Sequence, residues 1–175
     1  PPWHSEFRTP VELLEFITKL RTLSQGKPVG IKLCVGSITE VLALTKAIEE
    51  TGLHPDFIVV DGAEGGTGAA PVEFSDHVGM PLRDGLGVVV NALVGTGLRD
   101  KISVGASGKI VSGFDMAITL ALGADWCTSA RAFMFALGCL QSQQCHTNHC
   151  PVGIATQDPL RSRALKVDVK ADRVH

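Results

Sequence analysis

The sequence predicts an α/β fold with a parallel sheet, because short strands alternate with helices four times along its 175 residues. Capping residues mark helix starts at Thr9, Ser37 and Ser112. Between the helices lie short β-branched or apolar runs that suit buried strands. Parallel strands need a crossover connection, and the intervening helices supply it.

The expected elements follow one another closely. Thr9-Pro10-Val11-Glu12 is a capping box with proline at the first helical position, and Gly52 and Gly123 stop later helices. The segment from residue 63 to about residue 83 is a glycine-rich loop, and a loop of this length is usually functional or disordered. Helices are expected over residues 10–23, 38–51, 84–98 and 113–122 and from about residue 130, and strands over residues 29–35, 57–60, 102–106 and 125–128.

Glycine-rich turns follow the second, third and fourth strands but not the first. A doubly wound sheet would place its phosphate loop after the first strand, whereas a (β/α)8 barrel gathers the loops after its strands at one face. Four βα units are half of such a barrel, which needs about 250 residues when intact. We therefore predict that residues 1–158 form the C-terminal half of a TIM barrel and that residues 159–175 form a charged, mobile tail. The N-terminal half would be another chain, a second copy of this one, or absent.

Charge and hydropathy exclude two kinds of partner. The net charge of −2 gives no basic surface for nucleic acid or for an anionic membrane. The longest apolar stretches, such as residues 86–94, are too short to span a bilayer, and no signal peptide opens the chain. Five cysteines with a local cluster fit metal binding in a reducing compartment better than a disulfide framework. A cytoplasmic location is therefore expected.

Cys139, Cys145 and Cys150 lie within twelve residues of one another, and Pro151 follows the last of them. Thiolates are soft ligands that select zinc or iron–sulfur clusters, and a Cys-Pro ending is typical of iron–sulfur runs. Three cysteines suit a three-iron cluster. A four-iron cluster or a zinc ion would need a fourth ligand, for which the candidates are His146, His149, Cys34 and Cys127.

The loops after three strands together predict a site for a phosphorylated cofactor. The loop after the second strand contains Gly65-Gly66-Thr67, where glycine lets backbone N–H groups approach a ligand closely. In TIM barrels the loops after the last two strands commonly hold a phosphate at a helix N-terminus. The phosphate candidates in those two loops are Ser107, Gly108, Ser129, Ala130 and Arg131.

Lys32 lies inside an otherwise apolar strand, residues 29–35, where burial of an ammonium group is costly without a partner. Strand alternation puts it on one face with Gly30 and Cys34, and if that face lines a barrel the lysine points to its mouth. There it would stabilise negative charge on a reduced ring or bind a substrate carboxylate. Asp61 and Glu64, at the end of the next strand, are candidates to pair with Lys32 or with the substrate.

Several motifs together resemble the FMN-binding domain of glutamate synthase over nearly the whole chain, residues 1–158. The cysteine segment, residues 138–157, carries the most specific likeness, because it matches the three-iron cluster segment of that family. The matching motifs are Ile31-Lys32-Leu33, Gly65-Gly66-Thr67-Gly68-Ala69-x-Pro71, Leu98-Arg99-Asp100, Ala136-Leu137-Gly138-Cys139 and the run CHTNHCPVGIATQ at residues 145–157.

The resemblance implies a TIM-barrel oxidoreductase in which FMN reduces 2-iminoglutarate, formed from 2-oxoglutarate and ammonia, to L-glutamate. It implies a 3Fe-4S cluster that relays electrons from ferredoxin or from an NAD(P)H-oxidising subunit. By resemblance Lys32 is catalytic, beside the flavin or the 2-oxoacid. The residues implied to contact the flavin or its phosphate are Gly65, Gly66, Thr67, Gly108, Ser129 and Ala130, and the implied cluster ligands are Cys139, Cys145 and Cys150.

The chain also departs from that family. Ser107-Gly108-Lys109 stands where an Asp-Gly-Gln type of turn is usual, and Glu64 replaces an aspartate. These departures are similar to those of stand-alone glutamate-synthase-like proteins without a fused glutaminase, and they bear on the 2-oxoacid specificity. As half a barrel, the chain is expected to be inactive alone. The competing hypotheses are a non-catalytic half-barrel with a structural zinc or iron–sulfur site, and a different FMN barrel that uses the cysteines for redox sensing.

Overall fold

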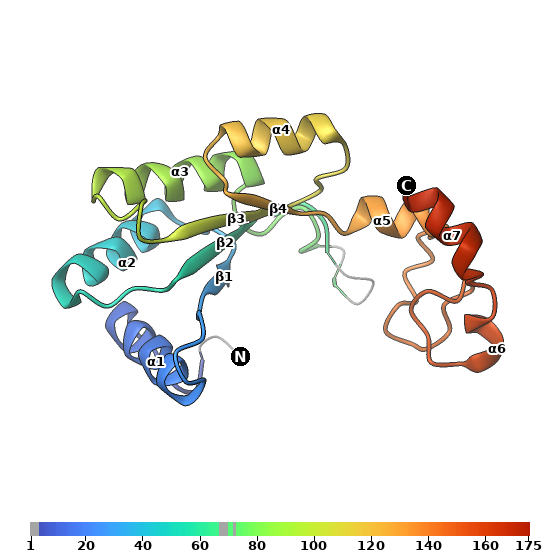
Figure 1. Cartoon of the computed structure of the whole chain (residues 1–175), viewed down its shortest axis with the longest axis horizontal. Coiled ribbons are helices and arrows are strands. Elements are labelled where there is room, and N and C mark those ends of the chain that lie inside the picture. The colour runs from blue at the N-terminus through green and yellow to red at the C-terminus, as the bar shows by residue number, and fades with distance from the viewer. Residues whose placement is uncertain (1–3, 67–69, 72) are drawn as a thin grey trace.

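The computed structural model describes residues 4–66, 70–71 and 73–175 as a mixed α/β fold with one parallel sheet (Figure 1). The strands lie in the order β1-β2-β3-β4, so each strand pairs with its neighbour in the chain. They are β1 (Ile31–Leu33), β2 (Phe57–Asp61), β3 (Ser103–Ser107) and β4 (Trp126–Thr128). The helices are α1 (Pro10–Leu23), α2 (Ile38–Thr51), α3 (Leu82–Gly95), α4 (Gly113–Ala121), α5 (Arg131–Ala136), α6 (Pro159–Ser162) and α7 (Val167–Val174).

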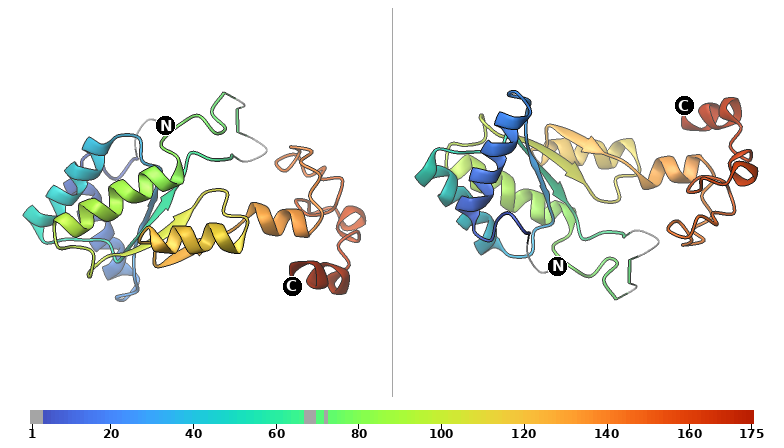
Figure 2. Two further views of the ribbon diagram at one scale, coloured as in Figure 1. Left: turned by 90° about the horizontal axis from the view of Figure 1, so that it is seen from above. Right: turned by 90° about the horizontal axis from the view of Figure 1, so that it is seen from below.

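One face of the sheet packs against the helices. Figures 1 and 2 show α3 and α4 along this face, and α2 and α1 continue the helical layer past β2 and β1. Side chains alternate between the two faces of a strand, and those that point to the helices form the core. The core members from the two central strands and from α3 include Ile58, Val60, Val104, Ala106, Leu86 and Leu93, all at most 3% exposed.

The opposite face of the sheet carries a different set of side chains. The register aligns Lys32 with Val59, Gly105 and Trp126 across the strands. Trp126 meets Phe57 edge to face with a ring-centroid distance of 6.0 Å. A Cβ atom at Gly105 would lie 2.5 Å from the Trp126 ring, so the indole rests directly on the β3 backbone.

Capping residues begin the helices much as the sequence predicts. The Thr9 hydroxyl accepts from the N–H of Glu12 (3.2 Å) and the Glu12 carboxylate accepts from the N–H of Thr9 (3.1 Å), which confirms the capping box of α1. At α2 the Ser37 hydroxyl accepts from the N–H of Thr39 (3.2 Å), which confirms Ser37 as the capping residue of this helix. Gly52 ends α2 with φ +68°, as expected of a left-handed cap.

Two carboxylates form hydrogen bonds at the amino-terminal end of the sheet. Each accepts hydrogen bonds from a backbone N–H group and from an arginine: Asp56 from Val29 and Arg21, and Asp125 from Val104 and Arg99. The bonds from Val29 and Val104 are both 2.6 Å long. Because Asp56 precedes β2 and Asp125 precedes β4, the two groups tie neighbouring segments together at the end of the sheet opposite the glycine-rich loops.

The parallel α/β prediction is confirmed, and the sequential strand order is consistent with a partial α/β barrel. A doubly wound sheet reverses its strand order at a switch point, and these four strands do not. The closed TIM barrel stays a prediction. Boundaries differ locally: β1 covers only residues 31–33 of the expected 29–35, and α3 runs from Leu82 to Gly95 rather than over residues 84–98.

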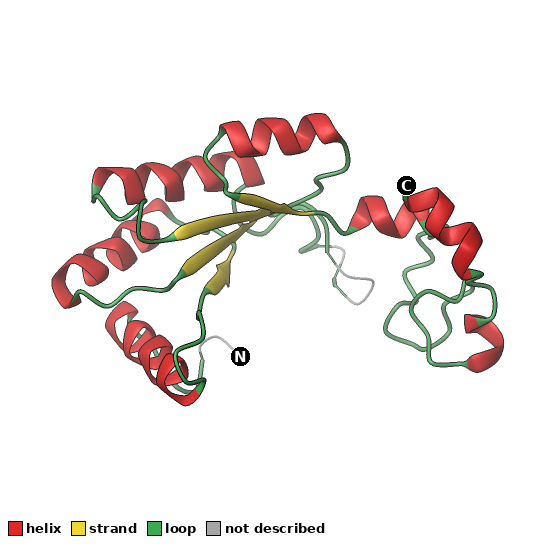
Figure 3. Ribbon diagram, in the orientation of Figure 1, coloured by secondary structure: helices red, strands yellow, loops and turns green. Residues whose placement is uncertain are grey.

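The C-terminal segment extends beyond the sheet and is joined to it through α5 (Figures 1 and 3). The tail, residues 159–175, contains the short helices α6 and α7, and α7 packs against α5. The mobility expected of this tail stays a prediction. No helix among the described residues is long and apolar enough to cross a membrane.

Candidate functional site

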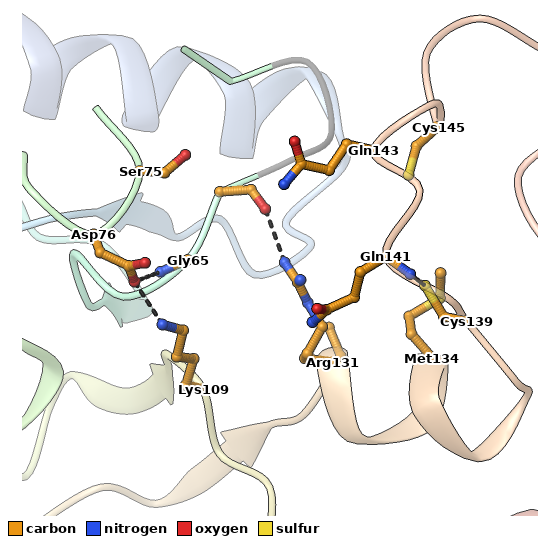
Figure 4. A pocket seen from close by; sticks show the side chains of 12 residues that line it. Gly65, Ser75, Asp76, Lys109, Arg131, Met134, Cys139, Gln141, Gln143 and Cys145 are labelled. Atoms are coloured by element: carbon orange, nitrogen blue, oxygen red, sulfur yellow. Dashed lines mark hydrogen bonds and ion pairs between the residues drawn. The ribbon is translucent and has the colours of Figure 1, made fainter. Parts of the chain in front are cut away.

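A cavity of about 450 Å³ lies between the carboxyl ends of the strands and the cysteine segment (Figure 4). Its volume falls within the roughly 300–1,000 Å³ of small-molecule sites. The loops after β2, β3 and β4 all contribute to its wall. The lining residues are Gly65, Gly66, Ser75, Asp76, Lys109, Ala130, Arg131, Met134, Cys139, Gln141, Gln143 and Cys145.

The glycine-rich loop reaches this cavity as two arms, residues 62–66 and 73–81, that are hydrogen-bonded to each other. Gly65 donates its N–H to Asp76 Oδ1 (2.5 Å), and its carbonyl accepts from the N–H of Asp76 (3.1 Å). Nearer the sheet, the N–H of Ala63 donates to the carbonyl of Met80 (2.9 Å). Gly65 has φ +96°, a backbone conformation that favours glycine. The two arms therefore form a connected base rather than an open coil.

Glu64 fixes the end of the second arm. Its carboxylate accepts from the N–H of Leu82, with N–O distances of 2.9 and 3.0 Å, at the first residue of α3. Pro81, the N-cap residue of α3, makes no side-chain capping bond, so Glu64 satisfies a helix N–H from 18 residues earlier in the chain. Glu64, expected to pair with Lys32 or with the substrate, instead caps α3.

Two cations approach the loop from the neighbouring turns. Lys109 Nζ lies 2.6 Å from Asp76 Oδ1, and Arg131 Nη2 donates to the carbonyl of Gly66 at 3.0 Å. Figure 4 shows both side chains on the wall below the glycine-rich loop. The hydrogen bond from Lys109, together with that from the N–H of Gly65, lowers the pKa of Asp76 below its usual value. The Asp76 carboxylate offsets the charge of Lys109 at this wall, so Arg131 supplies its net positive charge.

The facing wall comes from the cysteine segment. Cys139 and Cys145 both line the cavity, and Cys139 Sγ accepts a weak hydrogen bond from the N–H of Gln141 (3.4 Å). Gln141 and Gln143 have φ +54° and +57°, in the left-handed backbone region that residues other than glycine rarely adopt. Such backbone conformations concentrate at functional sites.

Cys150 is buried at 6% exposure beneath the turn that follows it. Burial alone would raise the pKa of its thiol, but hydrogen bonding from the N–H groups of the following residues outweighs it and lowers the pKa. The four donors are Ala155, Val152, Ile154 and Gly153. This turn therefore favours an anionic sulfur atom, as a metal ligand requires.

The thiols are not gathered into a coordination sphere. Over residues 4–66, 70–71 and 73–175, no group of three or more histidine, cysteine or acidic side chains is close enough to hold a metal ion. Cys139 and Cys145 share the cavity wall, while Cys150 is not among the residues that line it. The donor chemistry fits a cluster, and the three sulfur atoms would have to come closer together to bind one.

Lys32 is not among the residues that line this cavity. Its Nζ is 2.9 Å from Asp61 Oδ2, which confirms Asp61 as a partner. The Lys32 side chain is 57% exposed, so the ammonium group is not buried among the apolar residues of its strand. It stands on the sheet face opposite the helices, where the register aligns it with Val59.

The structure brings together some of the predicted cofactor residues and separates others. Those that line the cavity are Gly65, Gly66, Ala130 and Arg131, with Cys139 and Cys145 facing them. Thr67 lies outside the described residues. Ser107 and Ser129 use polar atoms within the scaffold: the Ser107 carbonyl accepts from the N–H of Gly62 (2.7 Å), and the Ser129 hydroxyl donates to the carbonyl of Ile110 (2.7 Å).

Sequence reasoning missed six residues that line the cavity. They are Ser75, Asp76, Lys109, Met134, Gln141 and Gln143. Lys109 directly follows the predicted Gly108, so its position next to a candidate phosphate loop was a usable signal. No local pattern predicts that Asp76 lies at the site, because its partners Gly65 and Lys109 are 11 and 33 residues away in the chain.

The chain belongs to the glutamate synthase family. A family model described as a conserved region in glutamate synthase matches residues 1–175, the whole chain. The chain is 47% identical over 169 residues to a glutamate synthase large subunit-like protein, YerD, of Bacillus subtilis. It is 37% identical over 175 residues to the archaeal NADPH glutamate synthase of Methanocaldococcus jannaschii, and 35% identical over 164 residues to ferredoxin-dependent glutamate synthase 2 of Arabidopsis thaliana.

These alignments cover 97%, 99% and 93% of this chain, respectively. The chain spans only 32%, 34% and 10% of the length of those relatives. Most of each relative therefore has no counterpart in these 175 residues.

Proposed function

We propose that this chain is part of a glutamate-synthase-type oxidoreductase, and that its cavity holds FMN next to an iron–sulfur cluster. One observation carries the proposal: the glycine-rich loop, Lys109 and Arg131 face Cys139 and Cys145 across a single cavity of about 450 Å³. Membership of the glutamate synthase family supports the reaction class.

The chemistry of the cavity fits a flavin mononucleotide. Gly65 and Gly66 present backbone without side chains, which allows close approach to a planar ring. Arg131 supplies a planar, permanently charged fork that suits a phosphate, and the ion pair of Lys109 with Asp76 lies on the same wall. FMN, when bound, supplies the redox chemistry, while these residues bind and orient it. Thr67, Ser107, Gly108, Ser129 and Ala130 remain proposed contacts.

Cys139, Cys145 and Cys150 are the proposed ligands of a 3Fe-4S cluster. Hydrogen bonds from backbone N–H groups to sulfur already surround Cys150 and reach Cys139, as is typical of iron–sulfur ligation. Because Cys139 and Cys145 line the cavity proposed for FMN, a cluster on them would lie beside the flavin. Cluster binding would also draw the loop between Cys139 and Cys150 together.

The proposed substrate is a 2-oxoacid of the 2-oxoglutarate type, converted through its imine to L-glutamate. Lys32 is the proposed catalytic residue, because its ammonium group stands on the open sheet face and can stabilise negative charge on the substrate or the reduced flavin. Its ion pair with Asp61 holds the side chain in place at 2.9 Å without burying it.

The proposed partners follow from the electron transfer that the reaction requires and from the sheet face that no helix covers. An electron donor, either ferredoxin or an NAD(P)H-oxidising subunit, would supply the cluster. The remaining half of the barrel, or a second copy of this half, would cover the open sheet face that carries Trp126 and Lys32. The 175 residues alone are proposed to be inactive, and turnover by this segment in isolation would disprove that statement.

Anaerobic purification of the full-length protein tests the proposal. We expect FMN, iron and acid-labile sulfide in one preparation, and glutamate formation from 2-oxoglutarate and ammonia with a reduced donor. A colourless protein that contains zinc would favour the structural metal site, and flavin without iron would favour the redox-sensing barrel. A protein with neither iron nor flavin would overturn the proposal.

A further inference from the structure

The Asp76 carboxylate joins two loops at the cavity wall. It accepts from the N–H of Gly65 at 2.5 Å and from Lys109 Nζ at 2.6 Å, and its own N–H donates to the Gly65 carbonyl at 3.1 Å. Gly65 is therefore held through both of its peptide groups by one residue. Asp76 is in turn held by a lysine from the turn after β3.

The backbone at this junction is unusual in both loops. Asp76 has φ +67° and Lys109 has φ +45°, and neither is a glycine. Residues other than glycine are strained in the left-handed backbone region and persist there where the surrounding structure holds them. The conformation at residue 109 turns its side chain back toward the glycine-rich loop (Figure 4).

Close backbone packing brings the two loops within reach of each other. A Cβ atom at Gly108 would lie 3.1 Å from Leu82 Cβ and 3.2 Å from the Gly62 nitrogen. The N–H of Gly62 also donates to the Ser107 carbonyl at 2.7 Å. The turn that carries Lys109 is thus seated against the base of the loop that it contacts, so the position of the lysine is set by the scaffold.

From this geometry we infer that Lys109 is a positioning residue: by holding Asp76, it fixes Gly65 and thereby the wall of the cavity. As an ion pair with side chains 50% and 46% exposed, Lys109 and Asp76 would add little to overall stability. Their effect is local, because the two hydrogen bonds between Asp76 and Gly65 lie at the cavity wall that Gly65 and Gly66 form. The consequence for FMN affinity rests on the proposed function, whereas the effect on the loop does not.

Amide hydrogen exchange in the full-length protein, without added FMN, tests the inference directly. In Lys109→Met we expect exchange over residues 62–66 and 73–80 to be roughly two- to five-fold faster than in the wild type, the range of an exposed ion pair. Lys109→Arg keeps the charge and should exchange like the wild type. The matched control is Lys46→Met, which removes an exposed ion pair with Glu50 (3.6 Å) on α2 and should leave the loop unchanged.

A charge exchange separates positioning of Gly65 from simple charge attraction. The double variant Asp76→Lys/Lys109→Asp restores opposite charges but leaves the N–H of Gly65 without a carboxylate acceptor, because an ammonium group only donates. We expect the loop to remain fast-exchanging in this variant. Full recovery of slow exchange would overturn the inference, as would unchanged exchange in Lys109→Met.

A salt titration of the wild type gives an independent measurement if a variant does not fold. Salt screens exposed charges, so exchange over residues 62–66 and 73–80 should rise toward the Lys109→Met level while exchange in α3 stays constant. Equal acceleration throughout the protein would show a general loss of stability and would contradict a positioning role.

FMN titration is the separate measurement for the cofactor. We expect Lys109→Met to raise the Kd for FMN by a similar two- to five-fold. A protein that binds no FMN but shows the exchange pattern would refute the proposed function and keep the positioning role. A protein that binds FMN with the same Kd in Lys109→Met, and without the exchange pattern, would refute the positioning role alone.

Discussion

Arg131 Nη2 donates to the carbonyl oxygen of Gly66 at 3.0 Å, which joins the first residue of α5 to the glycine-rich loop 65 residues earlier in the chain. The guanidinium group has four further N–H donors, so it can hold Gly66 and still bind an anion in the cavity. Arg131 therefore connects the two walls that a cofactor would contact.

We predict that Arg131→Met weakens FMN binding by about ten-fold or more, since a hydrogen bond to a charged group is worth roughly 1.5–3 kcal/mol. Arg131→Lys should bind FMN with an affinity between those of the wild type and Arg131→Met, because lysine keeps the charge but lacks the planar guanidinium fork. Fluorescence titration of the flavin-free full-length protein measures both. Arg83→Met is the control, because Arg83 contacts Asp115 at 3.9 Å and does not line the cavity. Equal loss in Arg83→Met would remove the specific role.

A second prediction concerns acid stability. The hydrogen bond from Arg99 is the largest influence on the pKa of Asp125 and lowers it. At Asp56 burial alone would raise the pKa, but hydrogen bonds from the Val29 N–H and from Arg21 outweigh it, so the pKa is lowered. A carboxyl group whose pKa is lower in the folded state stabilises the fold above its unfolded pKa of about 4. That stability is lost as the pH falls through the lower, folded value.

We therefore expect the urea midpoint of the wild type to fall below about pH 4. Asp56→Asn/Asp125→Asn should be less stable at pH 7 and should show a flatter dependence over that acid range, because two of the carboxyl groups with lowered pKa values are gone. Glu50→Gln, on the exposed face of α2, serves as the control. A wild-type midpoint that rises on acidification would contradict the sign of this prediction.

A third prediction compares two glycines. A methyl group at Gly105 would meet the Trp126 ring at 2.5 Å, whereas one at Gly87, inside α3, meets nothing within 4 Å. Gly105→Ala should destabilise the protein by about 1–3 kcal/mol through overpacking. Gly87→Ala should stabilise it by about 0.5–1 kcal/mol, since alanine favours a helix interior. Urea unfolding of both variants gives the comparison, and equal effects would mean that the indole moves aside freely.

The fourth prediction separates the cysteines. Cys150→Ser should remove most of the iron from anaerobically purified protein, because serine lacks the soft sulfur ligand that an iron–sulfur site requires. Cys127→Ser is the matched control: Cys127 is a partly buried thiol in β4, outside the cysteine segment. Iron and sulfide analysis reads out both variants. Retention of full iron in Cys150→Ser would exclude it as a ligand.

Much of the fold was predictable because its signals are local. The Thr9 capping box, the Gly52 helix stop and the β-branched strand at 57–60 each determine structure within a few residues. The predicted bounds of β1, residues 29–35, were too wide, because only residues 31–33 pair with β2. Strand pairing depends on the partner, and no single run of sequence contains that information.

The candidate site was only partly predictable for the same reason. Gly65, Gly66 and Arg131 were found because glycine turns and helix starts carry local signals. Asp76 lies in an unpatterned stretch and reaches the site only because Gly65 and Lys109 are folded next to it. Glu64 was predicted near Lys32 because both lie at strand ends, yet its carboxylate accepts a hydrogen bond from the N–H of Leu82 at the start of α3.

The unbroken strand order has a consequence for how such chains can be recombined. Each strand is hydrogen-bonded to the strand that immediately precedes or follows it in the sequence. A recombination point within a connecting helix therefore divides no more than one strand pair between the two parent proteins. Chimeras between this chain and its relatives should therefore inherit intact ladders on both sides of the junction, and their success would depend chiefly on whether the helix at the junction matches the sheet beneath it.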